Sequence, residues 1–152
     1  MTDRLTQAQR SELMSAVRGR DTGPEKAIRS LLHRMGFRFR LHAAELPGKP
    51  DIVLPRHRKA IFVHGCFWHG HKKCIRSERP KSNVDFWNAK LDGNISRDLV
   101  VRKRLQSLGW RVLVIWECQI GDADRLKLRL EKFVSGGGRI SVERPRPHQK
   151  LP

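Results

Sequence analysis

Apolar residues recur along the chain at intervals that predict helices and strands in turn. From Thr22 to Gly36 they fall on one helical face, at Ala27, Ile28, Leu31, Leu32 and Met35. Thr22 and Glu25 match the capping-box pattern of a helix start, and Gly36 is typical of a helix end. We therefore expect a helix over residues 22–36, with a shorter helix before it over residues 6–17.

Strand patterns follow this helix. Phe37–His42 alternates apolar and polar residues with the period of a half-buried strand. After the turn-like Leu46–Pro50, the short apolar runs Asp51–Leu54 and Lys59–Val63 are separated by Pro55–Arg58, which favours a hairpin. Three strands are therefore expected before residue 64.

The second half of the chain opens with residues 64–83, which have no apolar period. We expect a loop there, held in place by something other than a core. Beyond it the pattern predicts a helix over Asn94–Leu108, a buried strand over Arg111–Trp116 and a helix over Asp122–Val134. The glycine-rich residues 135–138 then break the chain.

The order of these elements predicts an α/β fold with a mixed central sheet flanked by helices. Residues 1–138 form a single domain in this interpretation. Residues 139–152, rich in proline and basic residues, form a flexible tail. A hydrophobic share of 38% is enough for one core.

Charge changes the picture from a generic α/β domain to one that binds a polyanion. The 152 residues include 32 Lys and Arg against 15 Asp and Glu, a formal net charge of +17. The excess is spread along the chain, which indicates a polyanion held against the folded body. No apolar run reaches the about 18 residues of a membrane span, and the polar first ten residues lack a signal-peptide core. We therefore expect an intracellular protein without a membrane anchor.

Cysteine and histidine cluster between His64 and Cys74, a density that chance rarely gives. Cys66, His71 and Cys74, joined by Cys118 further along the chain, supply a Cys3His set of the kind that holds structural Zn²⁺. Such a site would clamp the loop onto the sheet. The alternative is that Cys118 is an inert buried thiol and the histidines are solvated.

Asp51 begins a strand directly after Pro50, so its carboxylate can project from the edge of a sheet. Aspartate is also common at such positions for conformational reasons alone. On a basic protein that binds phosphodiesters, one or two carboxylates with phosphate and water oxygens are typical Mg²⁺ ligands. The histidines outside the zinc set, His64 and His69, are then available for general acid or base work, since imidazole titrates near neutral pH.

Aromatic residues stand in pairs in polar surroundings, at Phe67–Trp68 and Phe86–Trp87. Packing in a core is the ordinary role of such rings. On a chain this basic, the alternative is stacking on bases or wedging between base steps of a nucleic acid. The residues alone leave both interpretations open.

Several strings in the chain are similar to those of one known family. They are Asp21–Glu25, Leu46–Asp51, Phe62–His69, Phe86–Trp87, Asn94 with Asp98, Leu108–Val112 and Trp116–Cys118. They resemble the very short patch repair (Vsr) DNA mismatch endonucleases over roughly Leu13 to Cys118. That family is a divergent branch of the PD-(D/E)xK, restriction-endonuclease-like fold.

The resemblance implies a bacterial DNA-repair enzyme located in the cytoplasm, with the nucleoid. It would nick one strand of double-stranded DNA 5′ to the thymine of a T·G mismatch left by deamination of 5-methylcytosine. Asp51 would bridge catalytic Mg²⁺ ions, with the backbone carbonyl of Val63 as a further ligand. His69 would activate the attacking water, and His64 would assist at the metal-bound water or the leaving group.

The resemblance extends to further residues. Glu25 and Asp98 would orient waters or histidines, and the structural Zn²⁺ would be held by Cys66, His71, Cys74 and Cys118. Three aromatic side chains would insert beside the mismatch: Phe67, Trp68 and Trp87. Three further residues would help to recognise the mismatched bases: Met14, Lys90 and Asn94.

The chain departs from the family pattern in places. A well-known member has threonine where Val63 stands and one residue fewer between its matches to His71 and Cys74. The ordinary PD-(D/E)xK lysine is missing, because Phe62–His64 occupies its place, so a histidine is expected to be the base. Glu25 has a second interpretation, since a capping-box glutamate needs no catalytic duty.

The leading hypothesis is a Mg²⁺-dependent, strand-nicking mismatch endonuclease that acts as a monomer and leaves its product to downstream repair factors. One alternative is a restriction-like nuclease without mismatch preference. Another is a zinc-stabilised DNA-binding module without cleavage. Asp51 together with His69 argues against the last, because a binding module has no need of an acid beside a free imidazole.

Overall fold

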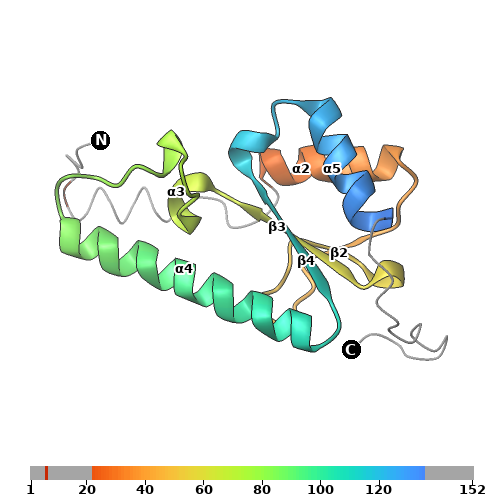
Figure 1. Ribbon diagram of the computed structural model, residues 1–152, viewed down its shortest axis with the longest axis horizontal. Coiled ribbons are helices and arrows are strands. Elements are labelled where there is room, and N and C mark those ends of the chain that lie inside the picture. Colours follow the sequence, from red (N-terminus) through yellow and green to blue (C-terminus); the bar gives the residue numbers. More distant parts are fainter. Residues whose placement is uncertain (1–5, 7–21, 136–152) are drawn as a thin grey trace.

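A four-stranded sheet forms the centre of the protein, whose computed structural model describes Thr6 and residues 22–135. The strands lie in the order β1 (Arg40–Leu41), β2 (Ile52–Leu54), β3 (Lys59–His64) and β4 (Arg111–Trp116). The β1–β2 and β2–β3 pairs are antiparallel, whereas β4 is parallel to β3. Helices cover both faces (Figure 1). The mixed sheet flanked by helices confirms the predicted fold class.

The helices are α2 (Gly23–Arg34), α3 (Cys66–His69), α4 (Val84–Ser107) and α5 (Ala123–Ser135). Three single turns of 3-10 helix span Pro55–His57, Ile75–Ser77 and Glu117–Gln119. Helices α2 and α5 lie on one side of the sheet, and α4 lies on the other (Figure 1). No helix in the described part of the chain is long and apolar enough to cross a membrane.

Strand alternation divides the core into two layers. Ile52, Leu54 and Ile61 pack with the buried residues of α2 and α5. Val53 and Phe62, which point to the other face, pack with Leu105 of α4 and with residues before and after the strands. Because neighbouring residues of β2 and β3 are buried on both faces, these strands are the rigid frame from which the site residues extend.

Three predicted elements need correction. The strand expected over 37–42 is only Arg40–Leu41, because its partner β2 is short and His42 has a left-handed backbone with φ 48°. The segment 64–83 is not one loop but contains α3 and the turn Ile75–Ser77. The helix expected from Asn94 begins ten residues earlier, at Val84.

The other expected elements occur, with ends moved by one or two residues. Met14, most of the helix expected over 6–17, and the tail 139–152 lie outside the described residues. Ser135, expected to begin the chain break, is the last residue of α5, and the remainder of that break is also undescribed.

Candidate active site and metal centres

The carboxylate of Asp51 lies at the end of the central hairpin, directly before β2. Its Oδ2 accepts a hydrogen bond of 2.7 Å from the amide of Val63. The N–H and C=O of a strand residue point to the same side of the strand, so the Val63 carbonyl faces the same space. Burial raises the pKa of Asp51 to about 6; the Val63 amide opposes this change, and the Glu25 carboxylate adds to it.

Two further side chains complete a cluster around Asp51. Glu25, in the first turn of α2, is buried, and His42 follows β1 directly. The ligating atoms of Glu25, His42 and Asp51 all lie within 4.8 Å of one another. One buried and one half-buried carboxylate beside a backbone carbonyl are a donor set that suits a hard divalent cation such as Mg²⁺.

Glu25 has the features expected of a helix-capping residue and also those expected of a residue in the site. The Thr22 hydroxyl accepts from the Glu25 backbone amide at 3.4 Å, so this position does belong to the helix cap. The Glu25 carboxylate, however, lies in the cluster: its Oε2 accepts from Arg29 at 3.1 Å and stands 3.9 Å from His42 Nε2. A capping position and a place in the site are therefore compatible.

His42 is the member of this cluster that sequence reasoning missed. In the sequence it is only a polar position in a strand-like alternation, and no ligand spacing marks it. Its placement depends on how β1, β2 and α2 come together, which a local pattern does not contain.

A pair of histidines lies on the α4 side of the sheet. His69 ends α3, and its Nδ1 is 2.7 Å from Oδ2 of Asp98 on α4. The ring of His64, at the end of β3, stacks on the His69 ring with 3.8 Å between centroids and 6° between planes. Burial, and then the neighbouring His69, lower the pKa of His64 to about 4, so His64 is neutral at physiological pH.

These three residues open onto a cleft of about 370 Å³ between the sheet and α4. Gly70 fixes the approach of α3 to α4 here. It has φ 65°, and a Cβ at this position would meet the Ile95 side chain at 2.5 Å. Glycine therefore permits both the turn after His69 and the close contact that brings His69 to Asp98.

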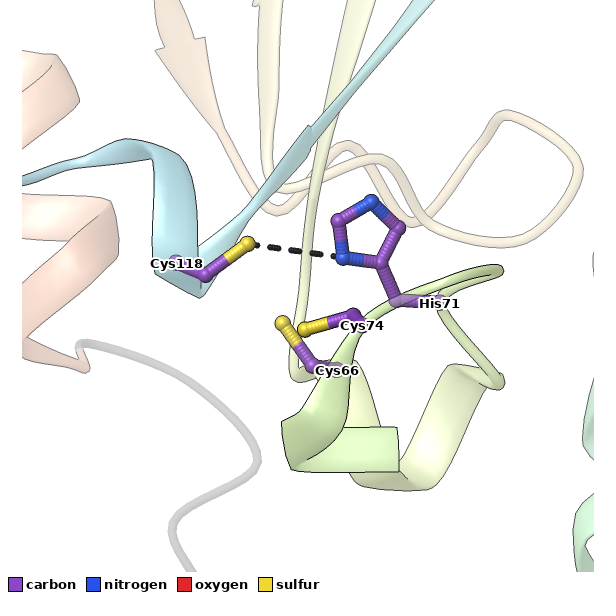
Figure 2. A group of neighbouring side chains, drawn as sticks. All are labelled: Cys66, His71, Cys74 and Cys118. Atoms are coloured by element: carbon purple, nitrogen blue, oxygen red, sulfur yellow. Dashed lines mark hydrogen bonds between the residues drawn. The ribbon is translucent and has the colours of Figure 1, made fainter. Parts of the chain in front are cut away.

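A second cluster of side chains that could hold a metal ion lies between α3 and the end of β4. Cys66, His71, Cys74 and Cys118 gather as the sequence predicts, with their ligating atoms within 4.8 Å of one another (Figure 2). The Cys118 Sγ is 3.4 Å from His71 Nδ1. Three thiols and one imidazole at this separation fit the tetrahedral set of a structural zinc site. Cys118 is exposed, so the alternative of a buried inert thiol is wrong.

The aromatic residues form one connected group. The Phe67 ring lies 5.1 Å from that of Trp68 and 5.4 Å from that of Trp87. Trp87 is 6% exposed, whereas Phe67 and Trp68 are half-buried and Phe86 is exposed. Trp87 therefore anchors the group against the protein, and its accessible part consists of Phe86 and the two rings of α3.

The residues expected to read DNA differ in their surroundings. Lys90 is an exposed residue of α4, with Arg97, Arg102 and Lys103 also exposed further along this helix. The Asn94 side chain donates a hydrogen bond of 3.0 Å to the Trp68 carbonyl, so it supports α3.

Comparison with known proteins identifies the fold and the family. The structure matches the homing endonuclease I-Bth0305I catalytic domain with a TM-score of 0.54 at 22% identity, covering 76% of this chain and 97% of that one. The family model of the DNA mismatch endonuclease Vsr matches residues 2–76.

Relatives extend this match over most of the chain. It is 50% identical to the type II nicking enzyme V.XorIIP of Xanthomonas oryzae pv. oryzae over 88% of this chain and 98% of that protein. It is 43% identical to the DNA mismatch endonuclease Vsr of Escherichia coli over 91% of each. The fold and these matches define a DNA endonuclease. Within that class, the chain belongs to the Vsr family of DNA mismatch endonucleases.

Proposed function

We propose that this endonuclease nicks one strand of a DNA duplex 5′ to the thymine of a T·G mismatch, with Mg²⁺ as its catalytic cation and Zn²⁺ as a structural one. The proposal is supported mainly by two groups of side chains that lie close together in a member of this family. Burial raises the pKa of the Asp51 carboxyl group, and His69, which is paired with Asp98, lies close enough to oppose this rise. A cation site and a base would therefore act at one place.

The acidic site is proposed to hold the cation through Asp51, Glu25 and the Val63 carbonyl. The chemistry that Mg²⁺ supplies when bound is Lewis-acid stabilisation of charge on the scissile phosphate. The chain contributes orientation: the Val63 amide fixes one Asp51 oxygen, which leaves the other directed away from that hydrogen bond.

His69 is proposed to take the proton from the attacking water. The Asp98 carboxylate accepts from Nδ1–H, so the lone pair of the ring resides on Nε2. His64 is neutral and stacked on it, so proton uptake by His69 meets no second imidazolium charge. His64 then acts as a neutral hydrogen-bonding group near the leaving oxygen or a bound water.

DNA binding is proposed to use the exposed basic residues of α4 and the aromatic group beside it. A chain of net charge +17 attracts duplex DNA without sequence preference. Phe67 and Trp68, backed by Trp87, would wedge at the mismatch, where base pairs are less costly to unstack. Lys90, Asn94 and Met14 would help to read the mismatched bases.

The cysteine cluster is proposed to bind Zn²⁺ and to hold α3 against the end of β4. Cys66 begins α3 and Cys118 follows β4, so one ion would join two segments of the chain that are 52 positions apart in the sequence. We further propose that the protein acts as a monomer in the bacterial cytoplasm and that repair factors process its nick.

The decisive experiment offers three otherwise identical duplexes, carrying T·G, C·G and T·A at one position, with Mg²⁺ or with EDTA added just before assay. Mapped single-strand nicks 5′ to the mismatched T, dependent on Mg²⁺, are expected. Equal nicking of all three duplexes would instead support a restriction-like nuclease without mismatch preference. Binding without any nick would support a DNA-binding module.

A further inference from the structure

His42 stands in the acidic site without a role in the function proposed above. Its side chain is 12% exposed, and its ligating atom lies within 4.8 Å of those of Glu25 and Asp51. The 3.9 Å between His42 Nε2 and Glu25 Oε2 would allow both atoms to contact one cation.

The contact with Arg29 shows which nitrogen of His42 carries a lone pair. Arg29 Nη2 lies 3.2 Å from His42 Nε2 and 3.1 Å from Glu25 Oε2. A guanidinium only donates hydrogen bonds, so Nε2 accepts here and is unprotonated. The lone pair of His42 and the carboxylate of Glu25 thus face the same positive group, as two ligands face a cation.

The backbone of His42 links this residue to Asp51. Its amide donates a hydrogen bond of 3.0 Å to the Asp51 carbonyl. His42 has φ 48°, a left-handed conformation that it shares with Lys49, Arg58, Lys73 and Asn83. The hydrogen bond to Asp51 therefore keeps His42 next to the acidic site.

We infer that His42 is a further ligand of the cation held by Asp51 and Glu25, and that its imidazole strengthens the binding of Mn²⁺ at this site more than the binding of Mg²⁺. The inference rests on the proposed function for the existence of the cation site. Imidazole nitrogen suits transition-metal ions, whereas Mg²⁺ is bound through oxygen. Arg29 contacts both ligands, so binding of the cation between them would require its guanidinium to move aside.

The test is pulsed electron paramagnetic resonance of Mn²⁺ added to zinc-loaded protein, which reports nitrogen bound to manganese without any measurement of activity. Thiolates favour zinc over Mn²⁺, so the cysteine cluster does not take up the probe. The wild-type protein is expected to show ¹⁴N coupling of a bound imidazole, and His42→Gln is expected to lose it. His69→Gln and the exposed control His33→Gln should keep it.

Titration of the same variants gives the metal preference. His42→Gln is expected to weaken Mn²⁺ binding about tenfold or more, with a smaller change for Mg²⁺. Mn²⁺ bound through Asp51 without nitrogen coupling, coupling that persists in His42→Gln, or no bound Mn²⁺ would each overturn the inference. Mn²⁺ binding that is insensitive to Asp51→Asn would contradict the cation site of the proposed function itself.

Discussion

The Nδ1 atom of His69 lies 2.7 Å from Oδ2 of Asp98, and this contact joins the last residue of α3 to the second half of α4. It fixes the direction of the ring as well as its position. Because the carboxylate can only accept, Nδ1 carries the hydrogen and Nε2 is left as the basic atom. The geometry of the base therefore depends on α4, the helix that also supports α3 through the hydrogen bond from Asn94 to the Trp68 carbonyl.

Asp98→Asn should reduce the single-turnover nicking rate by roughly 10² to 10⁴-fold, because an amide can donate to Nδ1 and stabilise the wrong tautomer. DNA affinity should change little. The matched control is Asp92→Asn on the same helix, whose carboxylate pairs with Arg79 and is 64% exposed. A similar loss of rate in both variants would mean that Asp98 matters only for the stability of α4.

Asp51→Ala should abolish Mg²⁺-dependent nicking and leave binding of mismatched duplex largely intact, because the cation site is lost but the basic surface is not. Gel-shift titration and nick mapping on the same preparation measure the two properties. Nicking near the wild-type rate would remove Asp51 from the site.

The raised pKa of Asp51 predicts a pH dependence of stability in buffer without added Mg²⁺. The folded pKa of about 6 exceeds the ordinary 3.8, so the stability linked to this group is complete below about pH 4 and is lost as pH rises through 6. Asp51→Asn should therefore raise the free energy of unfolding at pH 8 by ~1–2 kcal/mol, and by less at pH 5. Urea unfolding at both pH values measures this, with the exposed Glu131→Gln as a control that should show no such trend.

Cys118→Ser distinguishes a zinc ligand from a surface thiol. An exposed thiol without a ligand role should tolerate serine within about 0.5 kcal/mol. A zinc ligand should not: we expect loss of bound zinc by elemental analysis and a melting temperature lower by several degrees or more. Zinc-replete protein with no zinc, or a serine variant with unchanged zinc and melting temperature, would contradict the proposed site.

Trp68→Ala should lower the ratio of nicking at mismatched over paired sites more than it lowers overall DNA affinity, because a wedge converts the weaker stacking of a mismatch into selectivity. Ile75→Ala is the control, since Ile75 is a large apolar side chain 85% exposed in the same region. An unchanged ratio in Trp68→Ala would leave this ring with a packing role alone.

The sequence was sufficient for features that depend on local pattern. The hairpin Asp51–Val63 and the strand Arg111–Trp116 occur where their apolar runs predict them, and the four cysteine-cluster residues do meet. The start of α4 was missed because residues 84–93 mix polar and aromatic residues, with only Trp87 and Leu91 buried among them. A helix that packs along so narrow a line leaves no clear apolar period.

Residues that tertiary contacts bring into the site could not be predicted from the sequence. His42 joins Asp51 because a single residue after β1 turns into a left-handed conformation, and nothing in the neighbouring sequence signals it. The burial of Trp87 also required the structure, because its ring packs against Phe67 and Trp68 of α3, about 20 positions earlier in the sequence.

The short helix α3 also limits where insertions and deletions in this part of the chain can be tolerated. His69 lies between Cys66 and His71, which both belong to the cysteine cluster, so both ends of this segment are fixed. Each residue of a helix turns the next by about 100°, so an insertion or deletion between 66 and 71 would direct the imidazole away from Asp98. Between His71 and Cys74, by contrast, Lys72 and Lys73 are exposed, and an added residue extends only a surface turn. A change of length at that position would leave the contact between His69 and Asp98 unaltered.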